Sequence, residues 1–339
     1  MKTPNILNRL SCACGNQKTI KQLLKVIISL LLLAWLINKK VDWRHCVQLA
    51  GQAEAGMMIL AVALLTVERV LSVVKWRLFL TVKNAQISFW RLFIINYVGG
   101  FWGSFLPGSV GADIIRGFYL SRTTSDLSLT VASMAVDRTF SGLALVFLGC
   151  LGGWYAGYRA GLEYLHPLIL IIALLTLLGI ALLFQRRFLR MMDEQVIRRF
   201  SAWGFAHTLR KWIIACLEYK KFPGVLAQCF LLSLAMQFVR VLIFCVVALG
   251  FNVHVPVIYY LVFTPLISIL SMLPVSLNGI GVREAIFMSL FTAYAGMTKN
   301  EAFIIPFAVS ILTTLTTAAG GIIYMFDRNP GNPAPPPAD

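Results

Sequence analysis

Apolar runs that approach or exceed the length of a membrane-spanning helix constrain the fold of this chain more than any other feature. A helix needs roughly 18 to 20 residues to cross the hydrocarbon core of a bilayer. The long runs lie at about 22–38, 55–74, 127–150, 167–185, 225–250 and 302–326, and shorter ones lie at 92–106, 257–273 and 285–297. We therefore predict an all-α integral membrane protein, a polytopic helix bundle of about seven to nine membrane segments.

The charge content agrees with this class of protein. Only 13% of the 339 residues are charged, so the chain cannot cover a large water-exposed surface with polar groups. The net charge of +16 does not indicate nucleic-acid binding, because Lys and Arg concentrate between the apolar runs, as they do in cytoplasmic loops. We expect no nucleic-acid partner; attraction to anionic lipid headgroups is a secondary use of these charges.

The pattern predicts three parts of the chain. These are a basic cytoplasmic N-terminus at 1–21, a single transmembrane domain at 22–326, and a disordered Pro-rich tail at 327–339. The first run ends at Lys39 and Lys40 instead of a small-residue cleavage site, which favours an uncleaved membrane helix over a signal peptide. We expect a multi-pass protein of the cell inner (plasma) membrane with a cytoplasmic N-terminus.

No motif predicts a metal site, a cofactor or a soluble catalytic centre. The cysteines show neither CxxC spacing nor a His partner at a zinc-site interval, and we interpret them as small buried hydrophobes: Cys12, Cys14, Cys46, Cys150, Cys216, Cys229 and Cys245. The motifs HExxH, GxSxG, the P-loop and the dinucleotide fingerprint are absent from the sequence. We expect no cofactor and no enzymatic activity; intramembrane catalysis by Asp137 or Glu284 stays an open alternative.

The loop charges limit the topology. The connection 185–222 carries nine Lys and Arg against three Asp and Glu, a net charge of +6, and should be cytoplasmic. The connections 151–166 and 251–256 are almost uncharged and belong on the other side. A full crossing by 92–106 would reverse these assignments, so we predict that 92–120 and 257–297 dip into the membrane and return, at Leu106–Gly108 and at Leu273–Pro274. Irregular backbone at membrane depth must be buried in protein or line a cavity.

Two interrupted segments in corresponding places can mark a site between internal repeats. The stretch SFLPGSVGADIIR at 104–116 matches SMLPVSLNGIGVR at 271–283 at Ser, Leu, Pro, Ser and Arg, and each proline precedes its arginine by nine residues. The alternative is two unrelated loops that each contain a proline. The sequence leaves both open.

Charged residues inside the apolar segments are the candidates for a binding site, since an ionised side chain at mid-membrane costs at least about 2.5 to 3.5 kcal/mol on insertion scales. Glu68 and Arg69, like Asp137 and Arg138, are sequence neighbours that point about 100° apart on a helix, so each should find its partner on another helix. The candidate substrate-binding residues are Arg116, Arg283, Asp113, Asp137, Arg138, Glu284, Asn278, Arg69 and Arg240. The alternative is that these residues are intramembrane salt bridges that fix helix packing.

The residue types favour a phosphate-bearing amphiphile. The planar fork of arginine matches phosphate oxygens, and apolar walls can hold a lipid chain. Glycines at the interruptions would let backbone N–H groups approach an anion closely. The candidate hinge or backbone positions are Pro107, Gly108, Gly111, Pro274, Gly279 and Gly281.

Four stretches resemble the lysylphosphatidylglycerol synthase transmembrane region family: VERVLSVVKWRLFL at 67–80, LPGSVGADIIRGFYL at 106–120, the Asp137-Arg138 pair, and LPVSLNGIGVREAIF at 273–287. One departure is Ala112, where the family more often has a second glycine before the aspartate. In fused members this region is associated with moving an aminoacylated lipid across the bilayer. The resemblance implies translocation of a lipid that it does not name, and it does not extend to the lysyl transfer of the missing transferase domain.

Three functions follow from these observations. The protein binds and flips a lipid with an anionic phosphate headgroup, or it is a membrane subunit that presents a lipid acceptor to a separately encoded glycosyl- or aminoacyl-transferase. The third is a structural scaffold, in which the buried charges would be dispensable for lipid binding.

Overall fold

The computed structural model describes residues 42–85, 87–104, 111–124, 127–160, 221–271 and 281–326, with Tyr219 and a few isolated residues between 166 and 178. Nine helices and no strand are assigned in these residues, which confirms the predicted all-α fold for this part of the chain. The expected segments 22–38, 167–185 and 185–222 and the C-terminal tail lie wholly or mostly outside the described residues.

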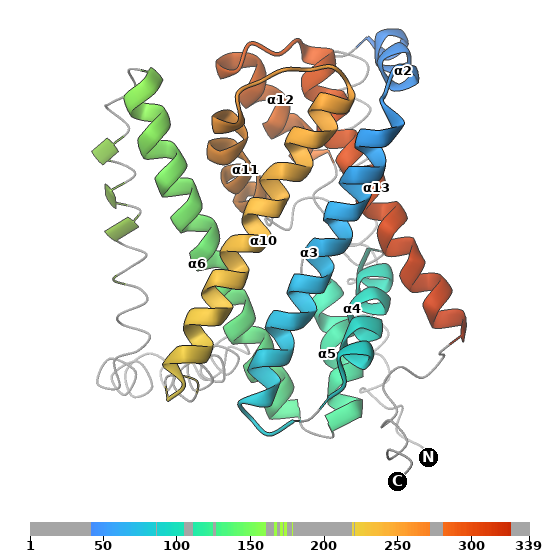
Figure 1. Cartoon of the computed structure of the whole chain (residues 1–339), viewed down its shortest axis with the longest axis vertical. Helices are drawn as coiled ribbons and strands as arrows, with labels where there is room; N and C mark the ends of the chain where they lie inside the picture. The colour runs from blue at the N-terminus through green and yellow to red at the C-terminus, as the bar shows by residue number, and fades with distance from the viewer. Residues whose placement is uncertain are drawn as a thin grey trace, which may run out of the picture.

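Four helices run along the long axis of the molecule (Figure 1), and each is long and apolar enough to cross a membrane. They are α3 (Ala55–Thr81), α6 (Leu127–Ala160), α10 (Pro223–Gly250) and α13 (Lys299–Phe326). Each contains a predicted run, but α3 and α6 continue past its expected end. In α3 the apolar residues Leu78, Phe79 and Leu80 follow the charged Lys75 and Arg77, so the helix does not stop at the first charge.

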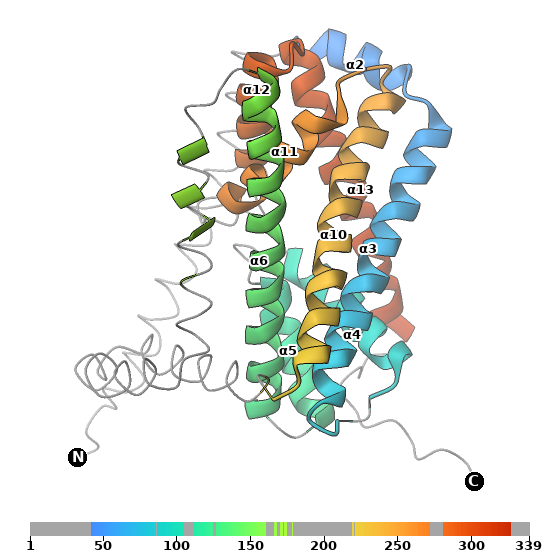
Figure 2. The same ribbon diagram turned by 60° about the vertical axis from the view of Figure 1, so that its left-hand side comes forward.

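Two pairs of shorter helices lie between these four. The pair α4 (Phe89–Ser104) and α5 (Gly111–Thr124) occupies the lower half of the molecule in Figures 1 and 2, whereas α11 (Val257–Ser271) and α12 (Val282–Tyr294) occupy the upper half. This confirms two interrupted, re-entrant segments. The pairs enter from opposite ends, as expected for an inverted repeat. Five predicted positions of the interruptions lie outside the described residues: Pro107, Gly108, Pro274, Asn278 and Gly279.

The ends of the helices agree with the predicted sidedness. The C-terminal end of α6 and the connection 251–256 lie together at the upper end of Figure 1, and Lys221, just before α10, lies at the lower end. This separates the two nearly uncharged connections from the end of the basic loop. The short helix α2 (Trp43–Gly51) also lies at the upper end, where Asp42 caps its N-terminus by accepting from the backbone N–H of Arg44 at 3.0 Å.

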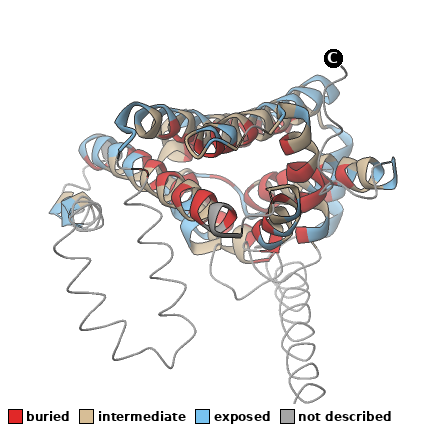
Figure 3. Cartoon of the chain, turned by 90° about the horizontal axis from the view of Figure 1, so that it is seen from below, coloured by how far each residue is buried: buried red, intermediate tan, exposed pale blue. Residues whose placement is uncertain are grey.

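The outside of the bundle is apolar and its interior contains polar groups. Large apolar side chains such as Ile59, Leu231 and Leu315 are more than half exposed, whereas Lys75 and Glu284 are buried. In the view along the bundle (Figure 3) the buried residues face the middle and the exposed ones lie on the periphery. A surface of this kind is suited to lipid, because polar groups inside the bundle can satisfy one another.

Glycines allow α4 and α5 to pack in direct backbone contact. A Cβ added at Gly103 would lie 2.3 Å from the Cα of Ala112, and one at Gly99 would lie 2.3 Å from Cγ of Arg116. Gly99 and Gly103 are four residues apart on one helix, as Ala112 and Arg116 are on the other, so two antiparallel faces interlock. The methyl group of Ala112 is accommodated by the missing side chain at Gly103.

Glycines join two further helix pairs in the same way. A Cβ at Gly320 of α13 would lie 2.1 Å from the carbonyl oxygen of Tyr97 in α4. On the other side of the molecule, a Cβ at Gly152 of α6 would lie 3.1 Å from the carbonyl oxygen of Leu261 in α11. Each re-entrant pair is therefore attached at close range to one long helix.

Candidate functional site

A cavity of about 350 Å³ lies midway along the bundle. It is lined by the central parts of α3, α6, α10 and α13, by Asn96 of α4, by the last turns of α11, and by the first turns of α5 and α12. Both re-entrant pairs therefore contribute to one cavity. The helices α5 and α12 begin at it, so the positive ends of their dipoles lie beside it.

The lining combines cations and hydroxyl groups with apolar side chains such as Leu65, Phe244 and Ile267. Two carboxylates, Glu68 and Asp137, line the cavity together with six cationic side chains: Arg69, Lys75, Arg116, Arg138, Arg240 and Arg283. The hydroxyl and amide groups are those of Ser72, Asn96, Ser141, Ser233, Gln237, Ser268, Ser271 and Thr313. Asp113 and Glu284 lie behind the wall. Even with these two included, the cations outnumber the carboxylates by two.

Arg116 is held in place from three sides. Its guanidinium forms an ion pair with Asp113, one helical turn earlier in α5, and lies 5.5 Å from the centre of the Trp76 ring. Its aliphatic part rests on Gly99. Asp113 also accepts from Arg138 of α6, so a single buried carboxylate serves two arginines that line the cavity. These two guanidinium groups together retain an excess positive charge.

Arg283 projects from the first turn of α12, whose backbone is fixed by Glu284. The fully buried Glu284 carboxylate accepts from the Gly281 N–H at 2.6 Å and from the Ser310 hydroxyl at 2.8 Å. Gly281 has φ +85°, a conformation that residues with a Cβ rarely adopt. Arg283 donates to Ser310 at 3.4 Å. The role of Glu284 in this structure is to hold the helix start from which Arg283 reaches the cavity.

Counted from the first residue of each helix, the third residue of α5 is Asp113 and the third residue of α12 is Glu284. Arg116 is the sixth residue of its helix, whereas Arg283 is the second. The arginines that align in sequence therefore reach the cavity from different helical turns, and the carboxylates share the structural register. A carboxylate in the first turn stabilises a helix through the N-terminal end of its dipole.

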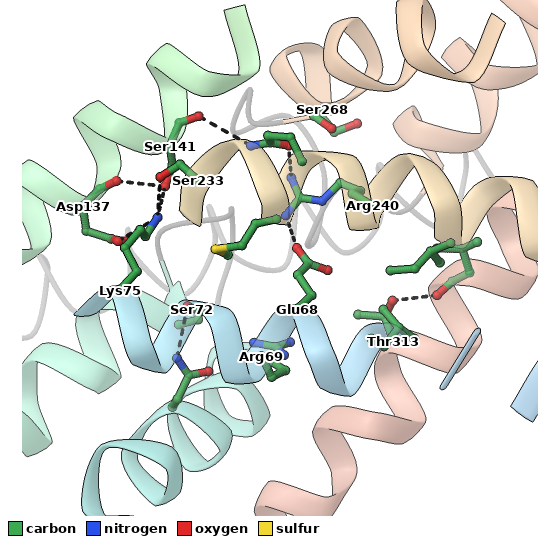
Figure 4. A pocket seen from close by; sticks show the side chains of 18 of the residues that line it. Glu68, Arg69, Ser72, Lys75, Asp137, Ser141, Ser233, Arg240, Ser268 and Thr313 are labelled. Carbon is green, nitrogen blue, oxygen red and sulfur yellow. Dashed lines mark hydrogen bonds and ion pairs between the residues drawn. The ribbon is translucent and has the colours of Figure 1, made fainter. Parts of the chain in front are cut away.

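Two ion pairs cross the cavity wall between long helices. Arg240 of α10 pairs with Glu68 of α3 and donates to Gln237 at 3.1 Å (Figure 4). Lys75 of α3 lies 2.9 Å from Oδ1 of Asp137 in α6. The prediction that the neighbouring charges find partners on other helices is confirmed for Glu68, Asp137 and Arg138.

Arg69 differs from the other cations. Its guanidinium lines the cavity beside Gly100, where an added Cβ would lie 3.5 Å from Nη1. Within the described part of the chain it forms no ion pair and no hydrogen bond. This positive charge at membrane depth therefore has no direct contact with a carboxylate, although Glu68 is close enough to interact with it electrostatically.

Lys75 corrects one expectation from the sequence, which ended the second long apolar run at residue 74. Because α3 continues to Thr81, Lys75 lies inside the helix and its side chain is 1% exposed. It donates to Ser141 at 2.7 Å and to Ser233 at 3.2 Å. The apolar residues after it were the available signal that the helix continues.

Most of the predicted residues gather at this one site. Six of them line the cavity: Arg69, Arg116, Asp137, Arg138, Arg240 and Arg283. Asp113 and Glu284 support that wall, and Gly111 and Gly281 lie at the starts of α5 and α12. Sequence reasoning missed Lys75 and the hydroxyl groups, since serine and threonine are common inside membrane helices and carry no signal of their own. The binding roles of these residues stay predictions.

Among the described residues, no group of three or more His, Cys, Asp or Glu side chains could hold a metal ion. Cys46, Cys229 and Cys245 are buried free thiols, in keeping with their interpretation as small hydrophobes, and Cys150 is partly exposed.

Comparisons with known proteins place this bundle in a family. No curated protein and no solved structure matches the chain. Residues 22–321 match the family described as the lysylphosphatidylglycerol synthase TM region, a range that includes every described residue of α2 to α12 and nearly all of α13. The match concerns the membrane region of those proteins and supports a lipid-related function in a membrane. The chain belongs to the lysylphosphatidylglycerol synthase TM region family.

Proposed function

We propose that the protein binds a lipid with a phosphate-bearing headgroup in the central cavity and translocates it between the leaflets. The observation that carries this proposal is the meeting of Arg116 and Arg283, one from each re-entrant pair, at one cavity where cations outnumber carboxylates. Guanidinium groups bind phosphate oxygens in a bidentate way, and the starts of α5 and α12 add two positive dipole ends.

The architecture supports translocation. A site midway between two re-entrant pairs that enter from opposite ends is typical of transporters that expose one site alternately to each side. The headgroup would bind the cavity while the acyl or isoprenoid chain stays in the apolar surroundings, and rocking of one half against the other would exchange the accessible side. The excess of Lys and Arg in the 185–222 loop favours an orientation with the lower end of Figure 1, where α10 begins, in the cytoplasm.

Native mass spectrometry of the purified full chain tests the binding step. We expect the wild type to retain a phosphate-bearing lipid and Arg116→Ala and Arg283→Ala to lose it. Arg122→Ala is the matched control, because Arg122 lies on α5 but outside the cavity and packs over the Phe118 ring. Retention of one unselective lipid mixture by all four proteins would overturn the proposal.

Leaflet exchange is then measured in proteoliposomes with a fluorescent form of the retained lipid. Exchange by the wild type and the control, and its loss in both arginine variants, is the expected result. Selective binding without exchange would support the alternative function, a membrane subunit that presents a lipid to a separate transferase.

A further inference from the structure

We propose that Asp137 is a proton-binding site coupled to the lipid site, and that it takes up one proton when an anionic headgroup enters the cavity. This inference rests on the proposed function and adds the co-substrate that could drive it. It starts from a cluster at the cavity wall in which Lys75 of α3 reaches between Asp137 and Ser141 of α6 and Ser233 of α10 (Figure 4).

Lys75 makes its ion pair and its hydrogen bonds with different residues of the cluster. The Lys75 ammonium lies 2.9 Å from Oδ1 of Asp137 but off the direction of a hydrogen bond, so the contact is an ion pair. Its hydrogen bonds go to the hydroxyls of Ser141 at 2.7 Å and Ser233 at 3.2 Å. These neutral contacts hold the ammonium in either charge state of Asp137, so the carboxylate can be neutralised without moving the lysine.

The two partners differ in their access to the cavity. The side chain of Lys75 is 1% exposed and that of Asp137 is 14% exposed, and both belong to the cavity lining. A proton from cavity water can therefore reach the carboxylate more easily than the ammonium. If Asp137 were neutralised in an empty cavity, a buried ammonium would lose its counter-ion, which is strongly unfavourable inside a protein.

The charged groups around Asp137 explain how a bound anion changes the preference of Asp137 between its ionised and its neutral state. Lys75 comes from α3, Arg116 from α5, and Arg138 from its own helix, while Asp113 on α5 compensates the two arginines. On α10, the Cys229 thiol interacts electrostatically with Asp137, and Arg240 lines the same cavity. The helix α11 contributes the hydroxyls of Ser268 and Ser271, and its described titratable groups, Tyr259 and Tyr260, lie in its first turn, away from the cavity end.

In the empty cavity Asp137 is the counter-ion of Lys75. A phosphate that binds Arg116 and Arg138 supplies the negative charge that these two arginines lack, because they share one carboxylate, Asp113. The same phosphate repels the Asp137 carboxylate, so protonation of Asp137 becomes favourable. Binding of a proton to Asp137 without the anion is unfavourable, and so is binding of the anion without the proton. Binding of both together avoids both penalties. Thermodynamic linkage requires the effect to be reciprocal: the proton strengthens anion binding by the same factor by which the anion strengthens proton binding.

The second ion pair of the cavity, between Arg240 and Glu68, is not expected to couple proton binding to anion binding. Arg240 is 31% exposed and also donates to Gln237, so it remains hydrated and held when Glu68 is neutral. A guanidinium stays protonated under all physiological conditions. Glu68→Gln is therefore the matched control, since it removes a carboxylate from the same cavity without leaving a buried ammonium.

The net charge that crosses the membrane with each lipid provides a second test of the coupling. One proton from water forms an O–H bond with a carboxylate oxygen of Asp137 and leaves again to water when the headgroup departs. A phosphodiester headgroup carries a single negative charge, so the pair crosses as a neutral unit. A pH gradient would then drive the exchange, and a membrane potential alone would not.

The test uses the purified full chain with phosphatidylglycerol as the probe, because its phosphodiester does not titrate near neutral pH. We expect affinity to rise on acidification by up to about tenfold per pH unit, the limit for one linked proton. The slope should persist in Glu68→Gln and vanish in Asp137→Asn. Infrared difference spectra should show a carboxylic-acid C=O band on lipid addition in the wild type and in Glu68→Gln but not in Asp137→Asn. This band shifts in D2O, whereas the ester C=O bands of the lipid do not.

The outcomes separate this inference from the proposed function. Absence of phosphatidylglycerol binding at every pH would count against the anion site itself. Binding with no pH dependence in the wild type, or an unchanged slope in Asp137→Asn, would overturn the proton site alone. If Asp137→Asn does not fold, Lys75→Met/Asp137→Asn removes the orphaned ammonium as well and should bind lipid with a flat pH profile; a retained slope there would overturn it too.

Discussion

Gly99 of α4 lies directly against the side chain of Arg116 on α5, and a Cβ at position 99 would approach Cγ of that arginine to 2.3 Å. The same Cβ would lie 3.3 Å from the Arg116 backbone nitrogen. Gly99 therefore provides the space in which the arginine extends along the wall toward Asp113.

Gly99→Ala should displace Arg116 and weaken lipid retention to the level of Arg116→Ala. Overpacking of this kind costs about 1 to 3 kcal/mol, so the unfolding temperature should also fall. Gly142→Ala is the control, because Gly142 has no atom within 4 Å of an added Cβ. Native mass spectrometry and thermal unfolding check both variants; full lipid retention by Gly99→Ala would contradict the prediction.

Removing one partner of the Lys75–Asp137 pair should destabilise the protein more than removing both. Asp137→Leu leaves a buried ammonium, and Lys75→Met leaves a carboxylate at membrane depth, at a cost of about 3 to 5 kcal/mol each. The double variant Lys75→Met/Asp137→Leu should recover much of that loss. A double-mutant cycle by reversible unfolding in mixed detergent measures the coupling energy, and simple additivity of the two single effects would contradict an ion pair.

Arg69→Gln should stabilise the lipid-free protein while weakening its hold on an anionic lipid. A charge at membrane depth without a direct ion pair is costly, and Arg69 forms no ion pair in the described part of the chain. Arg240→Gln should act in the opposite direction on stability, since it leaves Glu68 without its partner. Unfolding temperatures with and without added lipid distinguish the two; a loss of stability in lipid-free Arg69→Gln would show that the arginine has a structural role.

Gly281→Ala should destabilise the protein by roughly 1 to 3 kcal/mol, because its φ of +85° is strained for any residue with a Cβ. The strain would move the N–H that donates to Glu284, and with it the first turn of α12 that carries Arg283. Gly224→Ala, in the first turn of α10 with open space around it, is expected to leave the unfolding temperature unchanged or raise it slightly. Equal effects of the two substitutions would refute the backbone argument.

Cysteines introduced at the two ends should react from opposite sides of the membrane. Lys221 and Lys299 are exposed; Lys221 lies two residues before α10 and Lys299 begins α13, and these two helices start at the lower and upper ends of Figure 1. A membrane-impermeant maleimide added to intact cells should label Lys299→Cys and reach Lys221→Cys only after lysis. Native Cys46 can remain in an otherwise cysteine-free background, because burial, and then the neighbouring Asp42, raise the pKa of its thiol and slow alkylation. The reverse labelling pattern would invert the proposed orientation.

The sequence predicted the bundle and its two interruptions because length and charge decide those features locally. Apolar runs located α3, α6, α10 and α13, and the asymmetry of basic loops showed that 92–120 could not cross. The predicted end of α3 was wrong. In the sequence, a lysine after an apolar run looks the same whether it reaches the membrane surface or is buried among serines. Which face of α3 meets α6 and α10 is a tertiary property, so neither the site of Lys75 nor the contribution of Ser141 and Ser233 could be derived from the sequence.

The same limit applies to the arginines. Their spacing from Pro107 and Pro274 in the sequence made Arg116 and Arg283 look equivalent, but register within a helix depends on where the helix begins. The structure starts α5 at Gly111 and α12 at Val282. Because of this offset, Asp113 and Glu284 occupy equivalent positions in their helices, and the two arginines do not.

The backbone contacts at the glycines set the mechanical units of the molecule. Where Gly99, Gly103 and Gly320 bring α4 against α5 and α13, no flexible side chain lies between the backbones to absorb sliding, so these three helices behave as one stiff block. Gly149, where an added Cβ would lie 3.3 Å from Pro265, and Gly152 attach α11 to α6 and make a second block. The two blocks meet at the ion pair between Asp113 of α5 and Arg138 of α6, and otherwise through α3, α10 and α12. Relative motion of the blocks would therefore change the shape of the cavity that these helices line.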